Sequence, residues 1–238
     1  MFNKTTTSMS QEKILICQGV QINSHLSYEA TEIKKLQFKL GLGSDGLSRD
    51  ISVDWVAFIL DSRGKLISDS HFVFYNSDLR LKVKYPRCEH DLKYPLEILR
   101  SSEWDDQFKL YTESRPTDPE MSVIGPMEYA TSPRPDFNDD AEMDINLEKV
   151  HSAAYQIIIC AYSYHCPFGE TSAYLRLYNS NMQRCKTELF HEVNGKYPSS
   201  KVLELCRIFK NNNIWKIQAS NRGYPDIMML LEYGFDNL

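Results

Sequence analysis

Hydrophobic and polar residues alternate along much of the chain with the period of two that is typical of β-strands. In residues 34–42, for example, Leu36, Phe38 and Leu40 share one face. Residues 155–164, YQIIICAYSY, form a continuous apolar run instead, which indicates a fully buried strand. The same patterns predict further strands at residues 13–24, 51–60, 71–76, 143–147, 172–179, 187–193 and 214–220.

Two further segments bear on the fold class. Residues 201–210, KVLELCRIFK, fit a helix or a strand equally well. Residues 223–234 predict one short helix, because Pro225 stands at a first helical position and Gly234 at the end. About nine or ten strands with no regular alternation of helices predict an all-β protein, namely an antiparallel β-sandwich with a short C-terminal helix.

Residues 79–135 differ from the rest of the chain, since they are rich in proline and charge and show no sustained period. Proline cannot donate to a strand ladder, so we expect this segment to be a peripheral insertion on the outside of the core. Residues 1–12 are polar, and we expect a flexible tail there. The flanking halves hold too few strands to close alone, which predicts a single domain over residues 1–238.

A predicted hairpin over residues 53–76 carries oxygen-bearing side chains at its open end. Facing residues in an antiparallel hairpin have a constant index sum, and the polar turn centres near Lys65. Asp54 should therefore face Asn76, at the rim of an apolar face. That face is formed by Val56, Phe58, Phe72 and Phe74.

A second oxygen-rich stretch covers residues 135–148, which contain no Lys or Arg. Its acids are Asp136, Asp139, Asp140, Glu142, Asp144 and Glu148. Such dense like charge is costly unless it is solvated or neutralised, and Ca²⁺ takes about six to eight oxygen ligands. If the acidic loop folds over the Asp54 end, the two stretches form a cation site. An EF-hand is excluded, because Ala141 stands where glycine is needed and Leu147 where glutamate is needed.

Composition narrows the function classes. The chain has 238 residues, with 27 Lys and Arg against 32 Asp and Glu, so the formal charge is −5. A mildly acidic chain is a poor general nucleic-acid binder, because such binding needs a basic face. No apolar run is long enough for a transmembrane segment, and the N-terminus lacks the apolar region of a secretory signal. Scattered cysteines without a signal indicate a reducing, cytoplasmic location.

Several motifs resemble, in the right order, those of the TerD tellurite-resistance family of bacterial stress proteins. The segment VDWVAFILDSRGKLISDSHFVFYN (53–76) is similar to the family signature. Further similar segments are LGLGSD (40–45), NDDAEMDINLEKV (138–150), AYLRLYN (173–179) and WKIQASNRGYPD (215–226). The resemblance covers about residues 13–78 and 136–238, which is most of the chain.

The resemblance implies a β-sandwich that binds Ca²⁺ through acidic loops at one end. It also implies a non-enzymatic role in tolerance of tellurite, phage, bacteriocins and chemical stress. Other stress-resistance proteins, at the inner membrane surface, are the partners it implies. The ligands carried over by position are Asp54, Asn76, Asp139 and Asp140, with Asp45 as a further candidate and Asn138, Asp136 and Glu142 as replacements for lost ligands.

The chain also departs from the family pattern. Ser52 stands where the family has an aspartate, Ser77 where it has a second asparagine, and Ala141 where a glutamate is common. Fewer carboxylates leave less charge attraction, so we expect weak Ca²⁺ binding or the loss of one of two sites.

Two pairs of Cys and His residues are weaker candidates for a catalytic or metal site. His165 and Cys166 follow a buried strand, but adjacent residues of a strand point to opposite faces, which argues against a nucleophile pair. Cys88 and His90 supply two soft ligands where zinc takes four. We therefore expect no enzymatic activity. The alternative function is a β-sandwich that binds a sugar, another small ligand or a protein through residues 79–135, with a degenerate calcium site.

Overall fold

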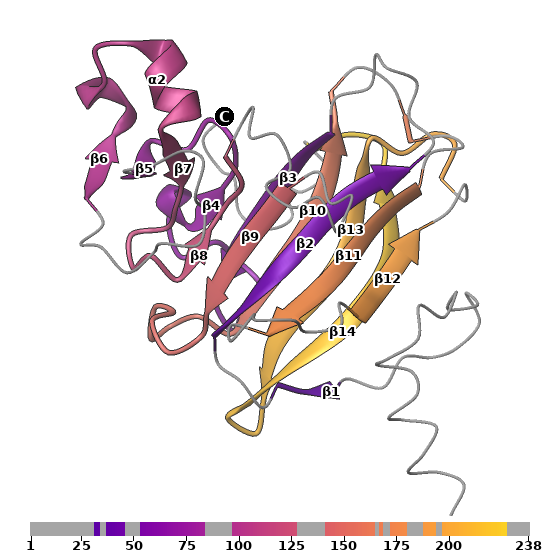
Figure 1. The fold of residues 1–238 in the computed structure, drawn as a ribbon. Helices are drawn as coiled ribbons and strands as arrows, with labels where there is room; N and C mark the ends of the chain where they lie inside the picture. The colour runs from indigo at the N-terminus through magenta and orange to yellow at the C-terminus, as the bar shows by residue number, and fades with distance from the viewer. Residues whose placement is uncertain are drawn as a thin grey trace, which may run out of the picture.

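The residues that the structure describes form three antiparallel sheets (Figure 1). The computed structural model describes residues 31–33, 37–45, 53–83, 97–127, 141–164, 167–168, 172–179, 188–193 and 197–227. The first sheet has the order β1-β14-β13-β10-β3-β4, the second β12-β11-β2-β9-β8 and the third β6-β5-β7. The predicted all-β, antiparallel class is confirmed.

The element bounds are as follows. The first sheet comprises β1 (Thr31–Glu32), β3 (Val53–Leu60), β4 (Phe72–Val73), β10 (Gln156–Ser163), β13 (Val202–Asn211) and β14 (Ile214–Tyr224). The second comprises β2 (Gln37–Asp45), β8 (Val123–Ile124), β9 (Ala141–Asn146), β11 (Ser172–Asn179) and β12 (Glu188–Val193). The third comprises β5 (Leu79–Lys82), β6 (Ile98–Arg100) and β7 (Ser114–Pro116). The helical elements within the described ranges are η1 (Asp69–His71), η2 (Ser101–Glu103) and α2 (Gln107–Thr112).

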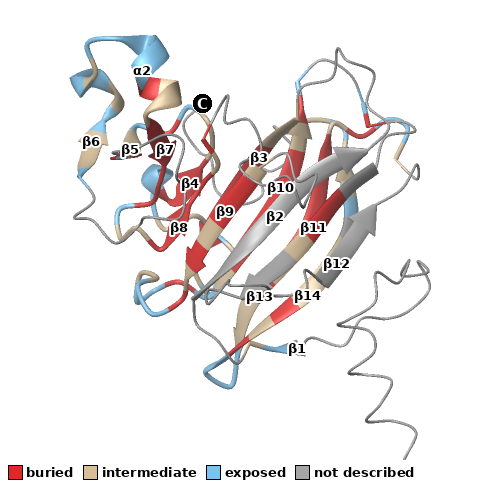
Figure 2. Ribbon diagram, viewed as in Figure 1, coloured by how far each residue is buried: buried red, intermediate tan, exposed pale blue. Residues whose placement is uncertain are grey.

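The first two sheets enclose one inner core, and the first sheet is also covered on its outer face. Trp55, Ala57 and Ile59 of β3 face the inner core. The alternating residues Val56 and Phe58 face a second, outer cluster. This burial on both faces explains why β3 and β10 read as continuous apolar runs. Figure 2 shows both strands as largely buried.

The predicted hairpin has the expected register, but its second strand is short. Ala57 pairs with Val73 and Phe58 with Phe72, so each pair sums to 130. β4 then ends at Val73, and Ser77 N donates to Phe74 O at 3.0 Å to close a turn. The ladder therefore stops before Asn76 could pair with Asp54.

The structure shows whether one ambiguous segment is a helix or a strand. Two other predicted segments lie wholly or mostly outside the described residues. All but the first residue of the segment 201–210 lies in β13, a strand between β10 and β14. The predicted strand at 13–24 lies outside the described residues, and so does most of the predicted helix at 223–234. β14 runs to Tyr224, which is inside the range predicted for that helix.

Only part of the segment predicted as an insertion is peripheral. The third sheet and α2 stand beside the sandwich (Figure 1). However, β8 pairs with β9 as an edge strand of the second sheet, and Val123 is fully buried in the inner core. A two-residue strand shows no period, which is why its pattern did not distinguish it from the surrounding loop.

Val123→Ala should therefore lower the free energy of unfolding by about 2 kcal/mol, since two buried methyl groups are lost and a cavity remains. Urea unfolding followed by circular dichroism measures the loss. Phe108→Ala is the matched control in the same segment, because Phe108 is 71% exposed, and it should change stability by less than about 0.5 kcal/mol. Equal effects would show that β8 contributes nothing to the core.

Candidate functional site: the loop end of the sandwich

Several strand ends lie at one end of the sandwich, here called the loop end. β2 ends there at Asp45, opposite Ser172 at the start of β11. β3 begins there at Val53, opposite Ser163 at the end of β10. β9 begins there as well, because Ala141 pairs with Leu42 near the end of β2. The chain thus brings the predicted ligand segments to the same end of the two sheets.

Asp54 is the second residue of β3 and is half-buried. It alternates with Trp55 of the inner core and so lies on the outer face of the first sheet. Its partner across the ladder is Tyr162 of β10. Burial raises the pKa of the Asp54 carboxyl, because the ionised form has lost part of its hydration. A cation at this position would stabilise the ionised form.

Asn76 belongs to a different element from Asp54. It is exposed in the turn that follows β4. The preceding residue, Tyr75, contacts Tyr164 at the end of β10, with their hydroxyl oxygens 3.3 Å apart and their ring centroids 6.3 Å apart. The turn of Asn76 is thereby held beside the end of β10, next to the strand that carries Asp54. Asp54 and Asn76 are not ladder partners, and what links their two elements here is the contact between Tyr75 and Tyr164.

Sequence analysis did not identify Tyr162, Tyr164 or Asp226 as neighbours of the predicted site. The rings of Tyr162 and Tyr164 are in contact at a tilt of 52°, with centroids 5.0 Å apart. Burial raises the pKa of Tyr162, and the nearby Tyr164, Asp226 and Asp54 raise it further. Asp226 therefore adds a second carboxylate near Tyr162. The spacing of Tyr162 and Tyr164 does predict a shared face, but it does not indicate that Asp54 lies opposite them.

Glu142 does not join Asp54. It alternates with Met143 and Ile145 of the inner core, so it lies on the outer face of the second sheet. Packed sheets stand about 10 Å apart, which places the two carboxylates on opposite sides of the sandwich.

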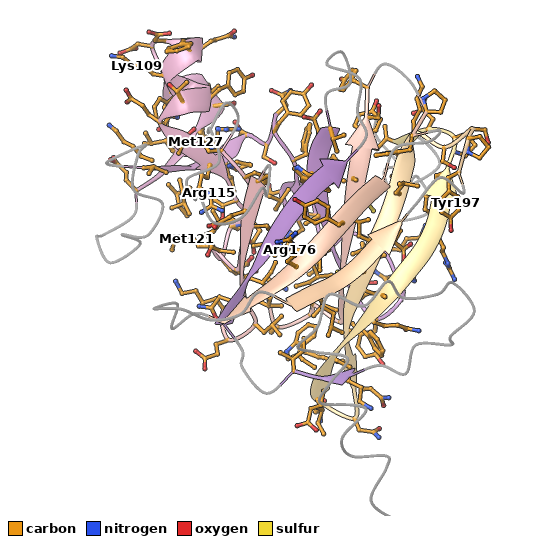
Figure 3. All side chains as sticks on the ribbon, turned by 45° about the vertical axis from the view of Figure 1, so that its right-hand side comes forward. Lys109, Arg115, Met121, Met127, Arg176 and Tyr197 are labelled. Carbon is orange, nitrogen blue, oxygen red and sulfur yellow. The ribbon has the colours of Figure 1, made fainter. Side chains whose placement is uncertain are left out.

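The acidic stretch has a basic partner that its own sequence lacks. Arg115 Nη1 is 2.6 Å from Asp144 Oδ2. Nη2 of the same residue donates to Glu142 O at 2.9 Å. Figure 3 shows Arg115 between α2 and the strands of the sandwich. Part of the charge predicted to require a cation is therefore neutralised by an arginine from the segment between β6 and β8.

The remaining predicted ligands lie partly or wholly outside the described residues. The backbone of Asp45 ends β2, but its side chain is not among those described. Asn138, Asp139 and Asp140 lie outside the described residues, directly before β9 in the chain. Within the described ranges, no group of three or more His, Cys, Asp or Glu side chains is placed to hold a metal. The same ranges contain no helix long and apolar enough to cross a membrane.

Comparisons with known proteins found similar structures and one matching family model. The structure is similar to the crystal structure of SAV2460, a protein of unknown function, with a TM-score of 0.50 and 12% identity over 82% of this chain and 93% of that chain. It is also similar to SCO6318 of Streptomyces coelicolor A3(2), a homologue of the telluride resistance protein TerD. There the TM-score is 0.43, with 12% identity over 82% of this chain and 94% of that chain. No curated protein matches the chain. The TerD domain family model matches residues 18–83, which confirms the predicted resemblance to the TerD family.

Proposed function

We propose that this protein is a non-enzymatic, calcium-binding protein of a bacterial stress response, and that the loop end is its calcium site. The observation that supports the proposal best is the half-buried carboxyl of Asp54, whose pKa burial raises. This group stands at the end where β9 follows Asp139 and Asp140 in the chain. A hard cation would offset the cost of an ionised carboxylate in this position.

The residues at this corner fit a calcium ion in type but not in number. Asp54, Asn76 and Asp226 offer carboxylate and amide oxygens, the ligand class that Ca²⁺ prefers. A full shell takes about six to eight oxygens, so Asp139, Asp140, backbone carbonyls and water would supply the rest. A shell with so few carboxylates should bind Ca²⁺ weakly, in keeping with Ser52 in place of an aspartate.

Calcium at millimolar concentration should raise the melting temperature of the protein, because a ligand bound only to the folded state stabilises it. At a concentration about one hundred times the Kd, the gain is about 2.7 kcal/mol. Asp54→Asn should abolish the rise, since it removes the central charge while keeping the shape. Without calcium the same variant should be at least as stable as the parent, because a partly buried charge has been removed.

Asp61→Asn is the matched control. Asp61 lies at the closed end of the same hairpin, where it pairs with Arg63 at 2.8 Å, and its replacement should leave the calcium-induced rise unchanged. Differential scanning fluorimetry with CaCl₂ and MgCl₂ series measures all three proteins. A parent protein that is insensitive to millimolar calcium would rule out the site.

The cellular role is proposed on the match to the TerD domain. Cells that express the parent protein should survive tellurite, phage or bacteriocin challenge better than cells that express Asp54→Asn. We place the protein in the cytoplasm, with other stress-resistance proteins at the inner membrane surface as partners. Equal survival of both strains at equal protein levels would separate calcium binding from stress tolerance.

A second candidate function rests on the third sheet, where Phe108 of α2 is 71% exposed. Lys82 lies over the ring of Trp104 in the same unit, at 5.9 Å from the centroid. An exposed aromatic residue of this kind suits a protein partner or a small ligand. Phe108→Ala should then lose a partner captured by the parent protein from stressed cells, while its calcium response stays intact.

A further inference from the structure

Aromatic side chains form a continuous path from the interior to the surface on the outer face of the first sheet. The ring of Phe58 stacks on that of Phe72 with centroids 4.7 Å apart, and Phe72 stacks on Phe74 with centroids 4.4 Å apart. Phe74 then meets Tyr75 edge-on at 5.6 Å. Phe58 and Phe72 are buried, and Phe74 packs against the same outer cluster. The path therefore fixes the ring of Tyr75 at the edge of a packed core.

Three tyrosines continue this path at the surface and are here called the tyrosine cluster. Tyr75 contacts Tyr164 at an interplanar angle of 72°, and Tyr164 contacts Tyr162 at 52°. Tyr164 is 48% exposed, while Tyr75 and Tyr162 are half-buried. Because the three rings are tilted against one another, their faces point in different directions around one place on the surface.

A carboxyl group lies directly beside the tyrosine cluster. Asp54 is the ladder partner of Tyr162, and such facing residues share one face of the sheet with their Cβ atoms about 4.5–5.5 Å apart. Among the residues that the structure describes, the Asp54 carboxyl has no hydrogen-bond or ion-pair partner. Burial raises the pKa of Tyr162 most, and the charges of Asp226 and Asp54 raise it further. Negative charge therefore surrounds the ring of Tyr162.

This combination of rings and charge suits an organic cation. The face of an aromatic ring is electrostatically negative, and quaternary ammonium groups bind against it. A trimethylammonium group needs no shell of oxygen ligands, so one carboxylate and several ring faces are sufficient for it. Ca²⁺ would need ligands from beyond the described residues, within which no group of three or more His, Cys, Asp or Glu side chains is placed to hold a metal. A neutral ligand would leave the charge of Asp54 without a partner.

We propose that the tyrosine cluster binds a small organic cation of the trimethylammonium class. The charge lies beside Asp54, and the methyl groups lie against the three tyrosine rings. The rings are already held in place by the phenylalanine path, which reduces the entropy lost on binding. This site goes beyond the proposed calcium site: it shares Asp54 with it but requires no calcium, so the two cations would compete.

NMR spectra of the tyrosine rings, recorded while choline chloride is added in EDTA at constant ionic strength, test this assignment. The ring signals of Tyr75, Tyr162 and Tyr164 should shift together with a Kd of about 1 mM, as expected for a ligand of this size with few contacts. The uncharged analogue 3,3-dimethyl-1-butanol has the same shape and should bind at least about fivefold more weakly, because it lacks the cation–π attraction. Unshifted signals at about ten times this choline concentration would overturn the proposal, and so would equal affinities of the two compounds.

Substitutions show whether the tyrosine cluster is the site. Tyr164→Leu removes the most exposed of the three rings and should weaken choline binding about fivefold, whereas Tyr164→Phe keeps an aromatic face and should stay within about twofold of the parent. Asp54→Asn should weaken binding by at least about fivefold, because the opposite charge is lost.

Tyr155→Leu is the matched control for Tyr164→Leu. Tyr155 is 43% exposed and directly precedes β10, the strand that Tyr164 directly follows, so this variant should bind choline like the parent. If Tyr155→Leu and Tyr164→Leu weaken binding equally, the tyrosine cluster is not the site. The ring signals of the parent protein give the same answer without any substitution, since Tyr155 should not shift with the other three.

The same titration separates this proposal from the calcium site. A protein that binds choline but is insensitive to calcium supports the organic-cation site and removes the other, and calcium binding without a choline shift does the reverse. Co-sedimentation with phosphatidylcholine vesicles identifies the source of the group. Choline binding with co-sedimentation indicates a lipid headgroup, and choline binding without it indicates a soluble compound, so both results keep trimethylammonium as the chemistry that is recognised.

Discussion

Replacing Arg115 by alanine is expected to destabilise the protein by about 3–5 kcal/mol, since it removes a buried guanidinium that pairs with the half-buried carboxylate of Asp144. Arg115 is 1% exposed. Its guanidinium donates to Gly125 O at 2.7 Å, Ile124 O at 3.2 Å and Glu142 O at 2.9 Å, in addition to the ion pair with Asp144. Alanine would leave three carbonyls and one carboxylate without these donors. Urea unfolding at pH 7 measures the loss.

Two further variants test the cause. Arg115→Lys keeps the charge but not the planar fork, so it should lose an intermediate amount. Arg100→Ala removes an arginine of similar size whose ion pair with Asp78 is exposed, and it should cost less than about 1 kcal/mol. If Arg115→Ala costs no more than Arg100→Ala, the guanidinium does not connect the segment to the second sheet.

Arg207→Ala should have a comparable effect, again about 3–5 kcal/mol, because Glu204 is fully buried and loses its counter-ion. Arg207 donates Nη2 to Glu204 Oε2 at 2.7 Å and Nε to the other oxygen. Tyr224 OH donates to the same carboxylate at 3.1 Å. A bulge between Glu204 and Cys206 places these residues, three apart, on one face of β13.

The double variant separates charge from packing. Adding Glu204→Gln to Arg207→Ala removes the unpaired charge and should recover part of the lost stability. Arg63→Ala breaks an exposed pair with Asp61 and should cost less than about 1 kcal/mol. A double variant as unstable as Arg207→Ala alone would show that the loss comes from packing, not from a buried charge.

Sequence patterns correctly predicted the elements that depend only on residues close together in the chain. β11 occupies the predicted residues 172–179, where apolar and polar residues alternate in the sequence. The register of the β3–β4 hairpin also followed from the sequence, since one short turn fixes the index sum. Local periodicity and turn chemistry are sufficient for both.

Features that join distant residues were not predictable in this way. Arg115 lies 29 residues from Asp144, and a charged residue carries no sign in the sequence that it will be buried. The helix α2 has six residues, too few for a helical period to be visible. Asp226 is near Tyr162 only because β14, β13 and β10 lie side by side. Each of these depends on sheet order, which single-strand patterns do not contain.

The pairing of β3 with β10 has a consequence for how the chain folds. Leu60 pairs with Gln156, a separation of 156 − 60 = 96 residues, and the third sheet and β8 lie between them. Closing so long a loop costs entropy before any contact forms, and folds with many distant pairings are slow to form. During synthesis, β3 can pair with the short strand β4 early, but it must wait for residues 156–163 to leave the ribosome before it has its long partner β10. A nascent chain that ends before β10 would expose the apolar faces of β3, which makes chaperone capture during translation an expected part of this protein's folding.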